Sequence, residues 1–369
     1  MLELDLTREL DRQLSVCNAC RYCEGFCAVF GAAQLHSAIG SGEVAYLANL
    51  CHDCRMCYDA CMFTPPHEYA LNIPAVMAEA RAQTYAAYAK PALLATLFRM
   101  PRRAAALSVA ASVVLLAVGV ALYAGPQALR PQLGPGSFYR ILPYIALLTG
   151  PLALAVFGLV SVLQSARSYA RDIGDGVRFA TAASLRIAFH DAFSLVYLKG
   201  GGAGCYDENR GSGRRRFFHG LVFWGFLADF AATISAALLQ DVFVQLPPYP
   251  LWSVPVVLGT GGGFAIGVGA AGLIAVKRRS DKRALSQQMV ALDYAFLSLL
   301  LLAAITGLAL LAFRSSGAMG TLLILHLGAV AGLFITAPYG KFVHFVYRFI
   351  ALIKNAHEQR AAKAGDPSS

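Results

Sequence analysis

Eight of the nine cysteines lie in two short runs near the N-terminus, and they constrain this part of the chain more than any other feature. Both runs leave two, two and three residues between successive cysteines: Cys17, Cys20, Cys23 and Cys27, then Cys51, Cys54, Cys57 and Cys61. Three closely spaced thiolates can wrap one 4Fe-4S cluster, while the fourth cysteine ligates the other cluster. The sequence therefore predicts two 4Fe-4S clusters. The first takes Cys17, Cys20, Cys23 and Cys61, and the second takes Cys51, Cys54, Cys57 and Cys27.

Zinc is the alternative metal for these cysteines, because paired C-x2-C elements also form structural zinc sites. Those sites use two pairs of cysteines, however, and not two runs of four. Disulfides do not fit, because the N-terminus reads MLELDLTREL, with no apolar export signal, and the thiols are then expected to stay reduced. The spacer 28–50 is rich in alanine and leucine, which favours helix. We therefore expect residues 1–80 to form a helical, ferredoxin-type domain with two clusters.

The remainder of the chain is too apolar for a soluble domain, since the sequence is 57% hydrophobic and 14% charged. Six stretches are long enough to cross a membrane, which takes about 20 helical residues each. The expected spans are 104–124, 139–164, 217–239, 251–276, 289–313 and 320–349. The predicted fold is therefore mainly α. It comprises the two-cluster domain (1–80), a connector (81–103), a six-helix transmembrane domain (104–350) and a cytoplasmic tail (351–369).

Lysine and arginine are distributed unevenly over the loops. Most lie in the segment 167–216 and in the loop after the fourth span, which carries Lys277, Arg278, Arg279, Lys282 and Arg283. The loops on the other side hold only Arg130, Arg140 and Arg314. The positive-inside rule then predicts a multi-pass protein of the cytoplasmic membrane, with both termini and the cluster domain in the cytoplasm.

The net charge of +10 is also uneven along the chain. Residues 1–80 hold ten acidic and four basic residues, whereas the remainder holds 27 basic and 11 acidic residues. The basic residues lie where membrane topology and anionic lipid headgroups require them, so we do not expect nucleic acid as a partner. The acidic domain is expected to dock on the basic loops or on a soluble partner.

Three of the eight histidines lie within or at the ends of the expected spans: His219, His326 and His344. Ionisable residues at this depth are costly and therefore indicate function. The third span enters from the cytoplasm and the sixth returns to it, so His219 and His344 should lie at the same depth beneath the clusters. Two imidazoles that face each other across a helical bundle satisfy the axial positions of a b-type haem. We therefore expect His219 and His344 to bind one b haem.

A second haem has no complete ligand pair. His326 and His344 are 18 residues apart, or about 27 Å along one helix. This resembles the cytochrome b subunit of membrane nitrate reductases, in which one helix carries a ligand near each end. The partner that a second haem needs, ten residues after His219, is Asp229. Asp229 and His326 are instead candidates for handling a proton.

Several other features have a structural interpretation. The stretch 176–199 is expected to lie along the membrane interface, and its His190 to be satisfied there by Asp191. The glycine-rich loop KGGGAGCYDENRGSGRRR is expected to be mobile, with Cys205 an ordinary exposed cysteine; a redox thiol is the alternative. Gly259, Gly263 and Gly267 recur every four residues, which favours close helix packing. The remaining histidines are expected to be structural or to face solvent: His36, His52, His67 and His357.

Three segments together resemble the tricarballylate-utilisation protein B family, also called citrate-utilisation protein B. They are the double cysteine module, the basic loop that leads into RRRFFHGLVFWGF, and the end of the last span, APYGKFVHFVYR. The resemblance covers nearly the whole chain. It implies that the partner is an FAD-dependent dehydrogenase that oxidises tricarballylate to cis-aconitate. It also implies that this chain reoxidises the reduced flavin of that dehydrogenase. Some members of the family are fused to their flavoprotein and serve oxidative cobalamin synthesis, so the substrate stays open.

We therefore expect an electron-transfer protein and not the subunit that transforms the substrate. Electrons are expected to pass from the flavin through both clusters and the b haem to quinone. One alternative is the same role in another pathway, such as cobalamin synthesis, a heterodisulfide-reductase-like complex or a respiratory complex. The other alternative is a membrane redox sensor, which would need an output domain that the tail KNAHEQRAAKAGDPSS does not offer.

Overall fold

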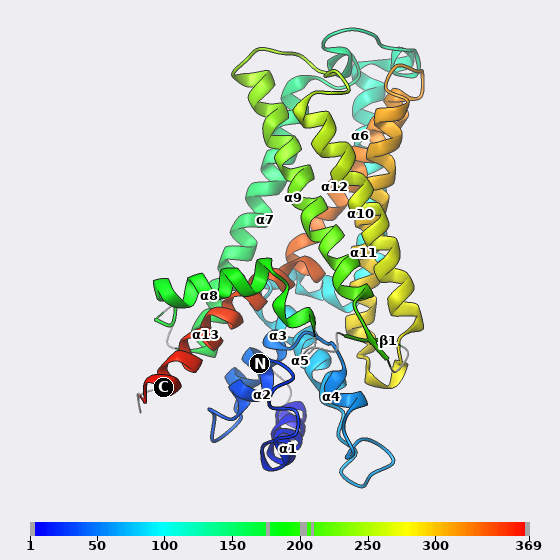
Figure 1. Cartoon of the computed structure of the whole chain (residues 1–369). Helices are drawn as coiled ribbons and strands as arrows, with labels where there is room; N and C mark the ends of the chain where they lie inside the picture. The colour runs from blue at the N-terminus through cyan, green and yellow to red at the C-terminus, as the bar shows by residue number, and fades with distance from the viewer. Residues whose placement is uncertain (1–3, 175–177, 200–204, 208–209, 366–369) are drawn as a thin grey trace.

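The computed structural model describes the whole chain except residues 1–3, 175–177, 200–204, 208–209 and 366–369. It is mainly helical, with a module of short helices at one end of a bundle of long helices (Figure 1). We call residues 4–88 the N-terminal module. The end of the bundle beside this module is the near end, and the opposite end is the far end.

Six helices of the described residues are long and apolar enough to cross a membrane, which makes the chain a multi-pass membrane protein. They are α6 (Pro101–Tyr123), α7 (Tyr144–Ile173), α9 (Arg214–Asp241), α10 (Val254–Arg279), α11 (Gln287–Ala312) and α12 (Met319–Thr336). Many of their large apolar side chains point outward, as lipid requires and water would not favour. Trp252 at the far end is 92% exposed, which suits an aromatic side chain at a membrane interface.

Short helices and turns connect these elements. The N-terminal module contains α1 (Leu4–Cys20), α2 (Ala28–Ala33), α3 (Ser41–Leu50), α4 (Met56–Asp59) and α5 (Ile73–Tyr88). The 3-10 turns are η1 (Ala92–Arg99), η2 (Gly125–Leu129), η3 (Ser137–Arg140), η4 (Val196–Lys199) and η5 (Lys282–Ala284). The expected interfacial stretch contains α8 (Ala182–Phe193), and β1 (Cys205–Asp207) pairs with β2 (Arg210–Ser212) as an antiparallel hairpin.

The last span differs from the single helix expected over 320–349. Helix α12 ends at Thr336, and the turns η6 (Ala337–Tyr339) and η7 (Lys341–Val343) precede a new helix, α13 (His344–Ala364). Pro338 explains the break, because proline has no backbone N–H and its ring clashes with the preceding turn of a helix. Figure 1 shows α13 leaving the bundle beside α8 and the N-terminal module.

Helix α13 gives the module and the bundle one continuous hydrophobic core. Tyr347 of α13 packs against Tyr85 of α5 and Tyr169 of α7, with ring centres 5.6 and 4.9 Å apart. The same core includes Leu14 of α1 and Leu47 of α3, both completely buried. Residues 351–364 therefore belong to a packed helix, where the sequence suggested a tail.

Helices α9 and α10 pack closely through glycine, but not through the expected repeat. A Cβ atom at Gly262 would collide with Asp229, and one at Gly269 would lie 2.8 Å from the carbonyl oxygen of Phe218. Of the expected repeat, Gly263 approaches α11 closely, because a Cβ atom there would lie 3.3 Å from Leu308, whereas at Gly259 and Gly267 it would make only ordinary contacts, at 3.6 and 4.0 Å. The close approach thus runs along the neighbouring face of α10.

Candidate metal centres

The first cysteine group combines three members of the first run with the last cysteine of the second run. Burial and the thiols of Cys23, Cys61 and Cys20 raise the pKa of Cys17 to about 12. Burial and the thiols of Cys61 and Cys20 raise the pKa of Cys23 to about 11. Cys61 therefore lies with the first run, although about 40 residues separate them in the sequence.

The second group is the complement of the first. Burial and the thiols of Cys54 and Cys51 raise the pKa of Cys27. Burial and the thiols of Cys54, Cys27 and Cys51, with Cys23 of the first group as the last contributor, raise that of Cys57. Cys27 lies directly before α2, whereas Cys51 follows α3 and Cys57 lies on α4. Members of both sets of four cysteines thus lie near one another in the N-terminal module, and their assignment to two clusters stays a prediction.

The backbone around both groups is tightly wound. Arg21 and Arg55, each directly after the second cysteine of its run, have φ values of 58° and 65°. This left-handed conformation is uncommon for residues other than glycine and turns the chain sharply around each group. The backbone N–H groups of Asp53 and Phe63 donate to the sulfurs of Cys51 and Cys61 at 3.4 and 3.3 Å. Hydrogen bonds to the sulfur ligands help to set the reduction potential of a cluster.

The number and kind of these side chains, four thiols in each group, suit a 4Fe-4S cluster. Among the described residues, no three His, Cys, Asp or Glu side chains converge closely enough to hold one metal ion. A tetrahedral zinc site needs such convergence. In a 4Fe-4S cluster each cysteine binds a different iron, so the four sulfurs lie further apart. Each group of four cysteines is therefore a fitting ligand set for one 4Fe-4S cluster.

Three arginines bind the backbone around Cys51, and we call Arg81, Arg215 and Arg348 the arginine clamp. Arg81 of α5 donates to the carbonyl oxygen of Ala48 at 2.8 Å and to that of Cys51 at 2.6 Å. Arg215 of α9 donates to the carbonyl oxygens of His52, at 3.0 Å, and Asp53. Arg348 of α13 donates to that of Leu50 at 3.2 Å. The clamp thus joins the second cysteine group to the near end of the bundle.

The positive charges of the clamp need negative charge nearby. Burial and the neighbouring Arg81 lower the pKa of Arg348 to about 10. Burial also opposes the charge of Arg81, but the neighbouring Cys51, Tyr85 and Asp53 raise its pKa above the usual value. A buried guanidinium group is costly without negative charge beside it. This arrangement suits an anionic cluster more than four neutral thiols.

His219 and His344 face each other just beyond the clamp. His219 lies in the second turn of α9, and His344 begins α13. Their ring centres are 6.3 Å apart and the ring planes are perpendicular. The Nδ1 atom of His344 lies 2.7 Å from the carbonyl oxygen of Lys341, to which it donates when protonated there. Burial lowers the pKa of His344 well below its usual value, so its imidazole is neutral.

This histidine pair fits the axial ligands of a haem. Two metal–nitrogen bonds of about 2 Å in line through one iron leave the ring centres of two imidazoles about 6 Å apart. The bond from Nδ1 of His344 leaves its Nε2 free, as a metal-ligating histidine with a backbone partner requires. The break before α13 matters here, because it allows His344 to turn toward α9.

The clamp and the histidine pair share two helices. Arg215 precedes His219 by four residues on α9, and Arg348 follows His344 by four residues on α13. Residues four apart lie on the same face of a helix. Each histidine therefore has, one turn closer to the module, an arginine that holds the second cysteine group. The sequence analysis missed the clamp, because the two four-residue spacings place each arginine on the face of its histidine but do not reveal the backbone carbonyl oxygens that it binds.

Asp229 and His326, the two candidates for handling a proton, have different neighbours. Nδ1 of His326 lies 3.3 Å from Oγ1 of Thr306 on α11. Asp229 lies against Gly262 of α10, and its buried Oδ1 has no hydrogen-bond partner among the described residues. The structure thus provides a separate environment for each side chain.

The other histidines and the last cysteine lie away from these groups. His190 is 3.2 Å from Asp191, His36 is 3.5 Å from Glu358, and His67 accepts from the backbone N–H of Tyr69 at 3.1 Å. His52 is buried against the ring of Tyr197. His357 is half-buried on α13. The centre of the glycine-rich loop and the side chain of Cys205 lie outside the described residues.

Comparison with known proteins matches almost the whole chain. Residues 10–87 match the Citrate utilization protein B Fer4-like domain, and residues 99–365 match Citrate utilization protein B. The chain belongs to the citrate utilization protein B family. The protein named Citrate utilization protein B from Escherichia coli is 41% identical over 367 residues, which cover 97% of this chain and 95% of that protein.

No solved structure matches the chain. The family assignment bears out the resemblance seen in the sequence, and the Fer4-like domain coincides with the N-terminal module. A citrate utilization protein B with such a domain and six membrane helices has an iron-sulfur electron-transfer role at a membrane.

Proposed function

We propose that this chain reoxidises the reduced flavin of a partner FAD-dependent dehydrogenase, similar to tricarballylate dehydrogenase, and delivers the electrons to quinone. Two 4Fe-4S clusters and one b haem are the proposed carriers, in a protein of the cytoplasmic membrane with its module and termini in the cytoplasm. The observation that carries the proposal is the order in which the sites follow one another in space. Two cysteine groups, the arginine clamp and the histidine pair follow one another from the module into the bundle.

The proposed ligands follow from the grouping of the thiols and the geometry of the histidine pair. Cys17, Cys20, Cys23 and Cys61 would hold the first cluster, Cys51, Cys54, Cys57 and Cys27 the second, and His219 with His344 the haem. When bound, these groups accept and release single electrons. The chain itself contributes the spacing between sites, since the clamp fixes the second cysteine group against the two histidine helices.

Exposure supports a direction of flow from the module to the bundle. Cys20 is exposed at the end of α1, so the first group is accessible to a soluble partner. Cys54 is buried and belongs to the group that the clamp holds near the histidines. Electrons would therefore enter at the first group and leave toward the membrane.

The decisive experiment replaces the histidines in anaerobically purified full-length protein. We expect about eight cluster irons and one low-spin b haem per wild-type chain. His219→Ala or His344→Ala should abolish or convert the haem spectrum and leave the EPR signals of both clusters intact. With reduced flavoprotein, the clusters should then stay reduced. His326→Ala is the matched control and should keep the haem.

Three results would contradict the proposal. A normal low-spin spectrum in both single variants would remove the ligand assignment, as would loss of the haem in His326→Ala alone. Stoichiometric zinc without a cluster EPR signal in the wild-type protein would remove the electron-transfer route as a whole.

A further inference from the structure

A lipid-facing groove of about 510 Å³ lies between α6 and α11 at the near end of the bundle. Its volume falls in the range of small-molecule binding sites, roughly 300–1,000 Å³. Ala106 and Ala110 of α6 and Ser298 and Leu302 of α11 are exposed along it, so the groove opens outward from the bundle. A ligand dissolved in the membrane could enter from the side.

The groove has a polar end and an apolar remainder. The guanidinium carbon of Arg102 lies 5.3 Å from the ring centre of Tyr294, a cation–π distance. Ser298 follows Tyr294 by one helical turn on the same face of α11. Alanine, valine and leucine side chains line the rest. This division suits a ligand with a small polar head and a long apolar tail.

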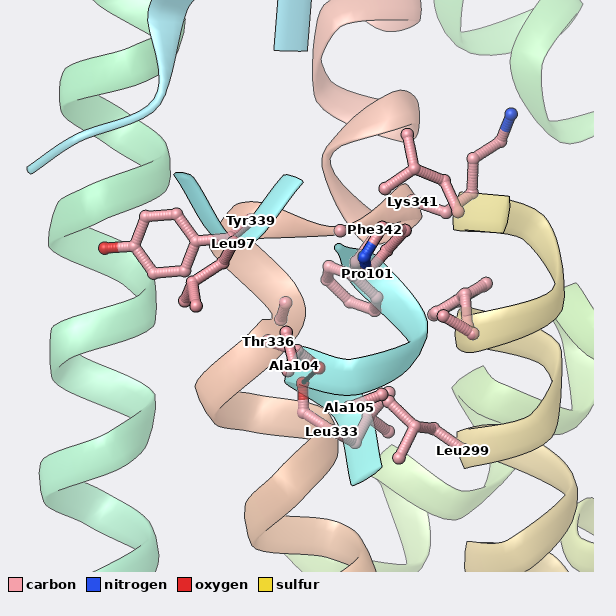
Figure 2. Close-up of a pocket in the computed structure, with 15 residues that line it drawn as sticks. Leu97, Pro101, Ala104, Ala105, Leu299, Leu333, Thr336, Tyr339, Lys341 and Phe342 are labelled. Carbon is pink, nitrogen blue, oxygen red and sulfur yellow. Dashed lines mark hydrogen bonds between the residues drawn. The ribbon is translucent and has the colours of Figure 1, made fainter. Parts of the chain in front are cut away.

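A cluster of buried charge lies behind the groove. Asp293, beside Tyr294 on α11, forms ion pairs with Lys277 of α10 and, at 3.0 Å, with Lys341. Lys341 also lines a small cavity of about 20 Å³, enough for about one water molecule. Figure 2 shows this cavity, with Lys341 and Phe342 beside Pro101 at the start of α6. Ala105, Ala295 and Leu299 line both the cavity and the groove.

The same region touches the histidine pair. The carbonyl oxygen of Lys341 lies 2.7 Å from Nδ1 of His344. Phe342, the next residue, packs on Phe296 of α11 with ring centres 6.0 Å apart. Phe296 lines the small cavity together with Phe342. The backbone of Lys341 and the packed rings of Phe342 and Phe296 therefore connect His344 to the inner wall of the groove.

We propose that the groove between α6 and α11 is the quinone site, with the quinone head between Arg102, Tyr294 and Ser298 and its isoprenoid tail along the alanines of α6. This rests on the function proposed above. The quinone takes two electrons, one after the other, from the reduced carriers held by this chain and two protons from water at the near end of the bundle, and it leaves as quinol. Arg102 and the hydroxyl groups of Tyr294 and Ser298 donate hydrogen bonds to its oxygens.

A phospholipid fits the groove less well. The groove offers one cation, Arg102, and its charge already faces the ring of Tyr294. A phospholipid brings an anionic phosphate and two acyl chains, whereas a quinone brings a flat neutral head and a single tail. The two ligands are distinguished by competition in the experiment that follows.

The test is photolabelling of the full-length protein in phospholipid vesicles with an azido-substituted quinone, followed by peptide mapping. We expect labelled peptides from 102–113 or 294–302, and displacement of the label by excess quinone. Ala110→Trp and Ser298→Trp, which fill the groove from opposite helices, should each lose at least tenfold in labelling and in the rate of quinol formation. Ala111→Trp is the matched control, because Ala111 is exposed on the same helix but does not line the groove.

The outcomes separate this proposal from the general function. Wild-type protein that reduces quinone while both tryptophan variants behave like Ala111→Trp would overturn the groove assignment alone. Displacement of the label by added anionic phospholipid, but not by quinone, would also overturn it and make the groove a lipid site. Wild-type protein that is reduced by its flavoprotein yet never reoxidised by quinone would overturn the quinone step itself.

Discussion

At the scale of single residues, each cysteine run contributes its fourth cysteine to the group formed by the other run. Cys27 lies with the thiols of the second run and Cys61 with those of the first, so each group depends on a residue that the other run supplies. The same exchange ties the loop after α1 to the loop after α3. Loss of one fourth cysteine should therefore damage the distant group.

We predict that Cys27→Ala damages the cluster proposed for Cys51, Cys54 and Cys57, and that Cys61→Ala damages the other. Each variant should lose up to about four irons per chain, one cubane. Iron analysis with EPR of the reduced protein measures the loss. Cys205→Ala is the control and should keep both signals. If each run instead supplied all four ligands of its own cluster, Cys27→Ala would lose the first cluster and Cys61→Ala the second.

At the scale of residues, the sequence predicts a site when the pattern involves residues that are close together in the chain. The spacing of the cysteines is a property of neighbouring residues, and it is enough to predict an iron-sulfur domain, which the Fer4-like match supports. The arginine clamp could not be predicted in the same way, because its partners are backbone carbonyl oxygens of residues 48–53. Such acceptors have no sequence signature, and only the folded chain brings them to Arg215 and Arg348.

At the scale of elements, the long apolar helices were predictable and the last one was not. Six spans follow from hydropathy alone, within a few residues of the expected bounds except at the near ends of α7 and of the last span. The apolar pattern also continues beyond Thr336, so it suggests one helix where the structure has α12 and α13. Pro338 marks the break. The direction of α13 depends on tyrosines of α5 and α7 that are far away in the sequence.

Helix α13 buries polar side chains as well as apolar ones. Glu358 accepts a hydrogen bond from Tyr46 of α3 at 2.9 Å and lies 3.3 Å from Lys354 and 3.5 Å from His36. Burial alone would raise the pKa of Glu358, but His36 and the charge of Lys354 bring it below its usual value of 4.5. These contacts fasten α13 to the N-terminal module.

The lowered pKa of Glu358 means that this residue stabilises the folded chain less as the pH falls. Because the pKa of Glu358 is lower in the folded than in the unfolded chain, its contribution is complete above the unfolded value of 4.5 and is lost as the pH falls through the folded value. Glu358→Gln should therefore cost about 2 kcal/mol in the free energy of unfolding at pH 6. The cost should shrink toward pH 4 in urea titrations. The exposed Glu68→Gln should show no such trend, and a constant difference across this range would contradict the assignment.

At the scale of the whole molecule, the module and the bundle form a single unit. Two kinds of contact join them: the hydrophobic core around Tyr347 and the arginine clamp on residues 48–53. The core is non-directional and holds the two parts together. The clamp is directional, since each guanidinium must meet particular carbonyl oxygens, and it therefore fixes the second cysteine group relative to His219 and His344.

This division of roles gives a prediction for Arg215→Met combined with Arg348→Met. Hydrogen bonds from charged donors are worth about 1.5–3 kcal/mol each, so amides of residues 50–55 should exchange hydrogen about ten to a hundred times faster. Exchange in α10 and α12 should not change, because the core around Tyr347 remains. Arg360→Met, an exposed arginine on α13, is the matched control. Unchanged protection at residues 50–55 in the double variant would mean that the hydrophobic core alone positions the second cysteine group, and that the clamp supplies only charge.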